Sequence, residues 1–251
     1  MKLLDKFELD ARLFTYKVAH DGGSAPNPYH NICTLAICKP AIRRVAVRGD
    51  VIAGLACKPD DTRLVYCMVV ERVLPWSDYI RACAGKGEGL YGMHARDLRK
   101  KVPASALDPG DCIWPDAGKY VEALASWSKH GGSEDFDRDV RNGENVLLST
   151  KFWYFGQGVE HAIHLENELL DLIPGRGHRS NANKKFREAF VDFFNSQLRS
   201  HKISGYGRFG TPAQGPGAVD EAQRSRCRAQ EVESDSYGEE DGADQAGCRH
   251  C

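Results

Sequence analysis

Residues 64–70 read Leu-Val-Tyr-Cys-Met-Val-Val, an uncharged run that decides how the rest of the chain is read. No polar residue alternates with the apolar ones, and this pattern is typical of a strand buried on both faces. The run is also far shorter than the roughly 18 apolar residues that a membrane-spanning helix needs. We therefore expect a central strand of a sheet here, in a globular domain and not in a membrane protein.

Other strand-like segments surround this central run. In 13–18, Phe14 and Tyr16 alternate with Thr15 and Lys17, as in a half-buried strand. Gly49-Asp50 can form a tight turn between two further strands. Strands are expected over 13–18, 33–38, 43–48, 51–57, 63–73 and 145–155.

Helical spacing dominates the second half of the chain. Leu165, Leu169 and Ile173 form an apolar stripe that Pro174-Gly175 ends. Helices are expected over 76–82, from 116 to beyond 124, over 165–173 and over 183–199. Closely spaced strands followed by helices predict an α+β fold, built on a small curved mixed sheet or barrel with flanking helices.

The net charge of −1 conceals an asymmetry along the 251 residues. Residues 204–251 hold nine Asp/Glu against five Arg, which leaves residues 1–203 with a net charge of +3. The acidic end is rich in Gly, Ser and Pro and poor in apolar residues, which is typical of disorder. We expect an N-terminal extension over 1–12, a folded domain over 13–203 and a disordered acidic tail over 204–251.

Nine cysteines are an odd number, so they cannot all pair within one chain. Asp5, Glu8 and Asp10 interrupt the apolar residues near the N-terminus, so no secretory signal is expected. A cytoplasmic, reducing location is therefore expected, with no membrane association. Cys33, Cys38, Cys57 and Cys67 lie in apolar runs, where a free thiol behaves as a small apolar group.

The segment from Arg12 to Arg48 is basic, with six Lys/Arg against Asp21 alone. Three of the cations, Lys39, Arg43 and Arg44, fall in one short connection that contains Pro40. Such a cluster suits a nucleic acid or nucleotide, because cations that neutralise phosphates release counterions. The alternative is a solvated surface with no ligand.

A second basic cluster covers 175–202. Arg176, His178 and Arg179 lie in a predicted flexible loop that leads into the last helix, and Lys184 lies in the first turn of that helix. Cations are unfavourable at a helix N-terminus, whereas a phosphate there is favoured by the dipole and the free backbone N–H groups. This placement indicates an anion site, and the alternative is an ordinary helix with poorly placed lysines.

The loop after the first strand places chemically active residues close together. Asp21, Cys33, Thr34 and Lys39 would converge if the 20–28 loop, which contains Asn27, lies beside the start of the 33–38 segment. They could form a nucleophile with its base or a hydrogen-bonded binding pocket, and the pocket is favoured. Cys33 could equally be buried and inert.

Aromatic residues could stack on a base. Most of them are expected in the core, and Trp153 and Tyr154 are the candidates for lining a site. No nucleotide-binding Gly-rich motif with a Lys at the required spacing occurs, and no nucleophile-elbow motif occurs. His161, His164 and Glu168 share a helical face, but an exposed polar face explains them better than a metal site. No metal or other cofactor is predicted.

Several of these stretches carry a family resemblance. They are residues 16–28 (Tyr-Lys-Val-Ala-His-Asp-Gly-Gly-Ser-Ala-Pro-Asn-Pro), 33–44, 49–50, 152–156 and 175–179. Together they resemble the second of the nucleotide-modification-associated domain families of bacteria and phages, over about 13–198. The Gly49-Asp50 turn and the strand after it are also similar to PUA-like modules that bind modified bases.

The resemblance implies a role in a DNA-modification or phage-defence system. As a binding module, the domain would recognise a modified base, nucleotide or DNA, with Arg43, Arg44, Arg176 and Arg179 on phosphate. As an enzyme, it would alter a base or nucleotide with Asp21 and either Cys33 or Lys39. A third alternative is a subunit that binds only a protein partner of such a system.

Overall fold

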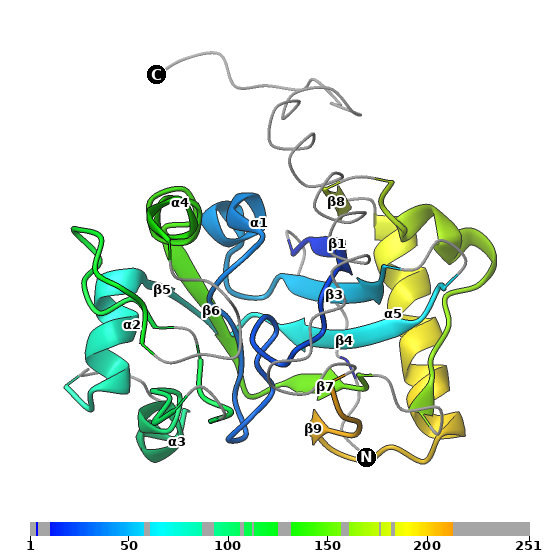
Figure 1. The fold of residues 1–251 in the computed structure, drawn as a ribbon. Helices are drawn as coiled ribbons and strands as arrows, with labels where there is room; N and C mark the ends of the chain where they lie inside the picture. Colours follow the sequence, from blue (N-terminus) through cyan, green and yellow to red (C-terminus); the bar gives the residue numbers. More distant parts are fainter. Residues whose placement is uncertain are drawn as a thin grey trace.

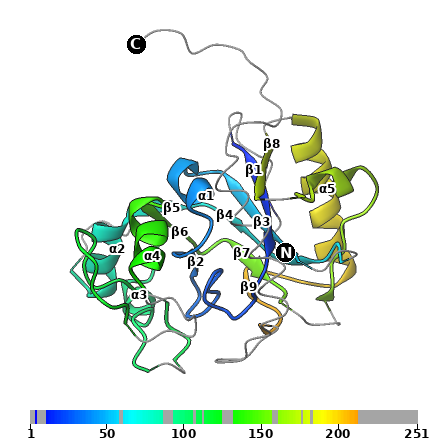
Figure 2. The same cartoon turned by 45° about the horizontal axis from the view of Figure 1, so that its top comes forward.

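The computed structural model describes residues 4, 11–57, 61–86, 93–105, 108–111, 113–124, 132–156, 161–175, 177–181 and 184–212. Two sheets lie at the centre of these residues (Figures 1 and 2). The long helix α5 (Lys184–Ser200) covers one outer side. The short helices α2 (Trp76–Cys83), α3 (Ala95–Arg99) and α4 (Ser133–Phe136) lie on the opposite side.

The larger sheet has six strands in the order β8-β1-β3-β4-β7-β9. Two neighbouring pairs, β1 with β3 and β7 with β9, are parallel, and the other pairs are antiparallel. The strands are β1 (Leu13–Val18), β3 (Val51–Ala56), β4 (Leu64–Val69), β7 (Phe152–Tyr154), β8 (His178–Asn181) and β9 (Gly207–Arg208). The α+β fold on a mixed sheet is confirmed, whereas no PUA-like closed barrel is formed by the described strands, because the sheet ends at β8 and β9.

The apolar run at 64–70 is a central strand, as the sequence predicts. Strand β4 lies between β3 and β7, and only Val69 is not fully buried within it. Leu64 and Cys67 pack in the core beneath α5, while Val65 and Met68 pack in the core between the two sheets. Apolar side chains on both faces are therefore required at this position of the fold.

The smaller sheet has the order β2-β6-β5, formed by β2 (Cys33–Leu35), β6 (Asn145–Ser149) and β5 (Arg72–Pro75). The single strands predicted over 63–73 and 145–155 are therefore wrong: each segment divides into two strands, one in each sheet. The points at which the two segments divide, Glu71 and Thr150, lie next to each other. The Glu71 carboxylate accepts hydrogen bonds of 2.6 Å from both the N–H and the hydroxyl of Thr150.

The strand predicted over 43–48 is also wrong, because residues 40–45 form helix α1 (Pro40–Val45). Pro40 occupies the first turn, where its fixed φ and missing N–H are compatible with a helix. The predicted helix from 116 is absent over 116–124, where Tyr120 instead contacts the rings of Trp114 and Phe136. The 165–173 helix is the shorter 3₁₀ helix η3 (Asn167–Leu172).

Both ends of the predicted domain differ from expectation. Leu4, in the supposed extension, is buried and exchanges two hydrogen bonds with the Asn195 side chain. Beyond 203, β9 pairs with β7, and the Tyr206 ring lies 4.9 Å from that of Trp153. The folded domain therefore includes the start of the supposed tail, and residues 213–251 lie outside the described part.

Two further expectations concern cysteines and membranes. Cys33 and Cys67 are buried free thiols, as expected, and Cys38 is a half-buried thiol. Cys57 is disulfide-bonded, so the expectation of a free thiol is wrong there. No helix within the described ranges combines the length and the apolarity needed to cross a bilayer.

Candidate functional site

One transverse row of the six-stranded sheet carries polar side chains on every strand except β3, which contributes Gly54. Residues in direct register across paired strands share a face of the sheet. The row consists of His178, Tyr16, Gly54, Tyr66, Tyr154 and Arg208, one from each strand in spatial order. We call these six residues the tyrosine row. The three tyrosines face the core between the two sheets.

The tyrosine hydroxyls form hydrogen bonds within the row and with the loop above it. The Tyr16 and Tyr66 hydroxyl oxygens lie 2.9 Å apart, and the Tyr154 hydroxyl donates to Asp21 Oδ1. Gly54 makes this possible, because a Cβ there would lie 2.4 Å from Tyr66 Cε1. The absent side chain of β3 thus leaves the space in which the Tyr66 ring lies.

Two loops add charged and aromatic groups at the edge of the row. Lys39 Nζ lies 5.2 Å from the centre of the Tyr16 ring, and the Arg208 guanidinium lies 4.8 Å from the centre of the Tyr29 ring. Lys39, Tyr29 and His178 are half-buried and Arg208 is exposed, whereas the three tyrosines are buried. The row therefore has a buried, uncharged centre and an accessible rim that carries cations.

Burial fixes the protonation state of the centre. It raises the pKa of Tyr16, Tyr66 and Tyr154 well above the ordinary tyrosine value, and the Asp21 charge raises that of Tyr154 further. At neutral pH the three hydroxyls are protonated and can donate hydrogen bonds. At the rim, burial and then the Lys39 charge lower the pKa of His178, which favours the neutral imidazole.

Cys33 lies close to the three tyrosines but is unsuited to nucleophilic chemistry. Its side chain is completely buried, and burial raises the pKa of the thiol to about 12. Only the thiolate is a strong nucleophile, and it is negligibly populated at neutral pH with such a pKa. The structure thus supports the inert interpretation of Cys33.

Thr34 and Asn27 point away from the row, into a buried cluster with Lys101, Tyr79 and Asp111. The Thr34 and Tyr79 hydroxyls both donate to Asp111 Oδ2, Tyr79 at 2.8 Å. Lys101 Nζ donates to the Asn27 carbonyl oxygen at 3.0 Å and also to Asn27 Oδ1. Because Thr34 and Asn27 are themselves 0% exposed, they hold the loop in place and do not reach a ligand.

The Lys101 cluster predicts a pH dependence of stability. Burial lowers the pKa of Lys101 from 10.5 to about 8, opposed by the Asp111 charge. Between these pH values the unfolded chain binds the proton and the folded chain does not, so this group adds stability as pH rises, by a total of about 3 kcal/mol. Urea unfolding from pH 7 to 10 should show the gain in the native protein relative to Lys101→Met. A difference that stays constant with pH would contradict the assignment.

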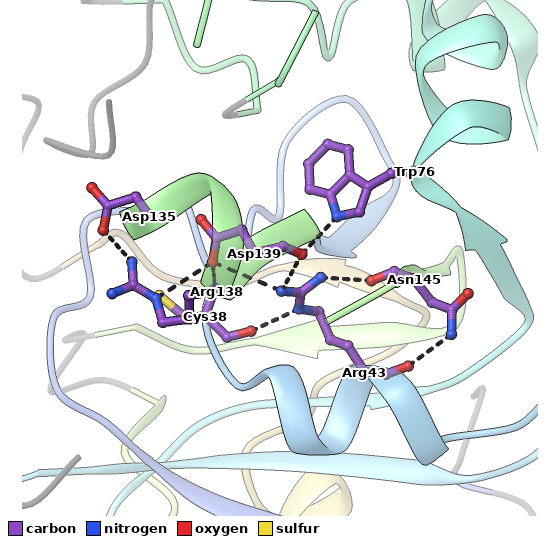
Figure 3. Close-up of polar contacts among 7 residues, drawn as sticks. All are labelled: Cys38, Arg43, Trp76, Asp135, Arg138, Asp139 and Asn145. Atoms are coloured by element: carbon purple, nitrogen blue, oxygen red, sulfur yellow. Dashed lines mark hydrogen bonds and ion pairs between the residues drawn. The ribbon is translucent and has the colours of Figure 1, made fainter. Parts of the chain in front are cut away.

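Arg43 is not available to a phosphate, contrary to expectation, because its side chain is completely buried. Figure 3 shows the polar contacts that it makes instead. Its guanidinium donates to the carbonyl oxygens of Cys38 at 2.7 Å, Asn145 at 2.7 Å and Asp139 at 2.8 Å. The helix α1 that replaces the predicted strand turns Arg43 inward and leaves Arg44 exposed. Of the two arginines, Arg44 alone can reach solvent.

The remaining candidates are dispersed. His178 and Arg179 lie in strand β8 and not in a flexible loop, with Arg179 exposed. Lys184 at the start of α5 is exposed and lies 3.8 Å from Glu188. Trp153 is on the opposite face of the sheet from Tyr154, buried against Phe194 of α5, so it cannot line the same site. Arg176 lies outside the described residues.

The structure therefore brings together Asp21, Cys33, Lys39, Tyr154 and His178 from the sequence candidates. It adds Tyr16, Tyr66, Tyr29 and Arg208, which the sequence reasoning missed. Tyr66 was assigned only to a strand, Tyr16 to a strand and to the stretch that carries the family resemblance, and Arg208 to the disordered tail. Among the residues described, no group of three or more His, Cys, Asp or Glu is placed to hold a metal ion.

Comparison with known proteins agrees with the resemblance in the sequence. The model of a family described as nucleotide modification associated domain 2 matches residues 10–214. This range contains the whole tyrosine row and both loops at its rim. No curated protein and no solved structure matches the chain.

Proposed function

Because the chain belongs to the nucleotide modification associated domain 2 family, we propose that a nucleotide or a modified base binds at the accessible rim of its tyrosine row. The family name connects the domain with nucleotide modification and does not state whether it recognises or alters its ligand. The observation that supports binding is the rim, where Lys39, Arg208 and Tyr29 lie at the edge of the buried tyrosines. The tyrosine hydroxyls are hydrogen-bonded within the protein and hold the rim in place.

Each rim group matches one part of a nucleotide. The Tyr29 ring, half-buried beside the Arg208 guanidinium, offers a face on which a base can stack. Beneath the rim, the Asp21 carboxylate is 6% exposed and accepts from the Tyr154 hydroxyl, and it would also accept from the amino or imino N–H groups of a base that reaches it. Lys39 and Arg208 supply the positive charge that a phosphate requires. The mildly basic folded part of the chain favours the same anionic ligand.

Recognition is favoured over nucleophilic catalysis because the thiol that catalysis would use is protonated and covered. Cys33 contributes neither charge nor access to solvent. The domain would then act as the reader of a modified base or nucleotide within a DNA-modification or phage-defence system. An enzyme that relies on Asp21 and Lys39 is the alternative, and product analysis after incubation with the ligand distinguishes it.

Calorimetric titration with modified and unmodified nucleoside monophosphates tests the proposal. We expect Asp21→Asn to change the order of affinities among bases, because an amide both donates and accepts where the carboxylate only accepts. Arg199→Gln is the control, since it removes an exposed cation from α5 on the other side of the larger sheet. Affinities that do not fall with added salt, or that Asp21→Asn leaves unaltered for every base, would refute the proposed site.

Lys39→Asn should separate ligand binding from stability. Lys39 has φ +45°, a left-handed conformation that asparagine adopts more readily than lysine. We expect an unchanged or slightly raised melting temperature, together with a loss of nucleotide affinity of about tenfold or more, because a charged hydrogen bond contributes about 1.5–3 kcal/mol. Thermal denaturation and titration of the same preparation check both results. Undiminished affinity would remove Lys39 from the site.

A further inference from the structure

We propose that the buried Arg43–Asp139 pair is a positioning unit that holds Lys39 over the Tyr16 ring at the ligand site. The inference rests on the proposed function for its consequence in ligand binding, but its geometric part stands by itself. Neither residue reaches the site: both side chains are completely buried. They would act through the backbone of Cys38, the residue before Lys39.

The backbone at Cys38 and Lys39 needs external support. Both residues have left-handed φ angles, +60° and +45°, and Pro40 follows directly. Two consecutive non-glycine residues in this region are unfavourable, and the residue before a proline is normally extended. Such a conformation persists only where the surrounding structure imposes it, and it often occurs at functional sites.

The pair imposes this conformation from both sides of Cys38 (Figure 3). The Cys38 N–H donates to Asp139 Oδ1 at 2.9 Å, and Arg43 Nε donates to the Cys38 carbonyl oxygen at 2.7 Å. The backbone N–H and the backbone carbonyl group of Cys38 are thereby both fixed. The direction in which the chain leaves Cys38, and hence the position of Lys39, follows from these two bonds.

The pair itself is held rigidly by its neighbours. The Asp139 carbonyl oxygen accepts hydrogen bonds of 2.8 Å from Arg43 Nη2 and from Trp76 Nε1. The Asp139 carboxylate lies 3.8 Å from Arg43 Nη2 and 3.6 Å from Arg138 Nε. Asp139 belongs to a π-helical segment, η1 (Asp137–Arg141), a rare conformation that occurs frequently at functional sites.

Stability alone does not explain why charged groups occupy this position. A buried ion pair can often be replaced by apolar side chains of similar volume with little loss of stability, because the desolvation of both charges is avoided. What apolar side chains cannot supply is the donor to the Cys38 carbonyl and the acceptor for its N–H. The specific contribution of the pair is therefore the fixed backbone at Cys38.

The double variant Arg43→Met/Asp139→Leu tests the inference with the full chain. Lys39 Nζ lies over the Tyr16 ring, 5.2 Å from its centre, so the ring current should shift the NMR signals of the protons at the end of this side chain. The loss of these signals in Lys39→Asn identifies them. We expect the double variant to lose this shift and to bind nucleoside monophosphates about tenfold more weakly, as Lys39→Asn does. Combined with Lys39→Asn, it should weaken binding no further, because both act through the same side chain.

The control is Arg81→Met/Asp78→Leu, which removes an exposed ion pair from α2 and should leave both readouts unchanged. If the double variant does not fold, Arg43→Lys replaces it, since it keeps the buried charge but loses the Nε donor to Cys38. A retained Lys39 shift in either folded variant would overturn the inference. A lost shift with unchanged nucleotide affinity would support the positioning role and instead contradict the proposed ligand site.

Discussion

Replacing Gly54 by alanine should lower the free energy of unfolding by about 2–3 kcal/mol and abolish nucleotide binding at the tyrosine row. The added Cβ would lie 2.4 Å from Tyr66 Cε1 and 2.7 Å from Val18 Cγ2. Both neighbours are buried side chains in the core between the sheets, so neither can move away without displacing others. The Tyr66 ring must shift, and its hydrogen bond with Tyr16 would be broken.

Denaturant unfolding and nucleotide titration measure the two effects of Gly54→Ala. Gly132→Ala is the matched control, because a Cβ at Gly132 would meet no atom within 4 Å. The control should alter neither the unfolding midpoint nor the affinity beyond a few tenths of a kcal/mol. If Gly54→Ala binds nucleotide as the native protein does, the tyrosine row is not the binding site.

The strands near the centre of the larger sheet were predictable because their pattern is local. The continuous apolar run in 64–70 reflects burial on both faces. The alternation in 13–18 located strand β1, but the half-buried strand that it predicted is wrong, because Thr15 is 0% exposed and only Lys17 is partly exposed. The divisions at Glu71 and Thr150 were not predictable, since neither segment contains glycine or proline there. The two turns are stabilised by contact with each other, across 79 positions of sequence.

The candidate site was predictable only where its parts are close in sequence. Asp21, Cys33 and Lys39 lie within one short stretch, and their convergence follows from a single turn of the chain. The tyrosine row instead requires the register of six strands, from Tyr16 to Arg208, which no local pattern contains. The number of basic residues in 12–48 did not reveal that Arg43 is buried, because it does not distinguish a guanidinium that contacts solvent from one that donates to backbone carbonyl groups.

The two rim loops share a principle of construction. One precedes and the other follows strand β2 of the smaller sheet, and each is held by a buried pair of opposite charges. Arg43 and Asp139 hold the loop of Lys39, and Lys101 with Asp111 holds the loop of Asp21 through Asn27 and Thr34. The sequence predicted ligand contact for Asn27, Thr34 and Arg43. In the structure these three buried residues instead hold the loops that carry Asp21 and Lys39.

Removing the Asp111 charge should have the largest effect on stability of any single change at these supports. Asp111→Leu leaves the completely buried Lys101 without its principal opposing charge, and it leaves the buried hydroxyls of Thr34 and Tyr79 without their acceptor. Breaking one partner of a buried charged pair costs about 3–5 kcal/mol. We expect a loss of stability in this range by denaturant unfolding.

The double variant Lys101→Met/Asp111→Leu distinguishes an electrostatic cause from simple loss of packing. With both charges removed, no buried ion remains uncompensated, so the double variant should be more stable than Asp111→Leu alone by at least 1–2 kcal/mol, even though it carries one more substitution. Additive destabilisation would mean that Lys101 and Asp111 do not interact.

The same double variant should also affect the binding site. Because Lys101 donates to both oxygens of Asn27, its loss should loosen the loop that contains Asn27 and Asp21. Nucleotide affinity should then remain low although stability recovers, and this separation of the two quantities identifies the pair as a support for the site.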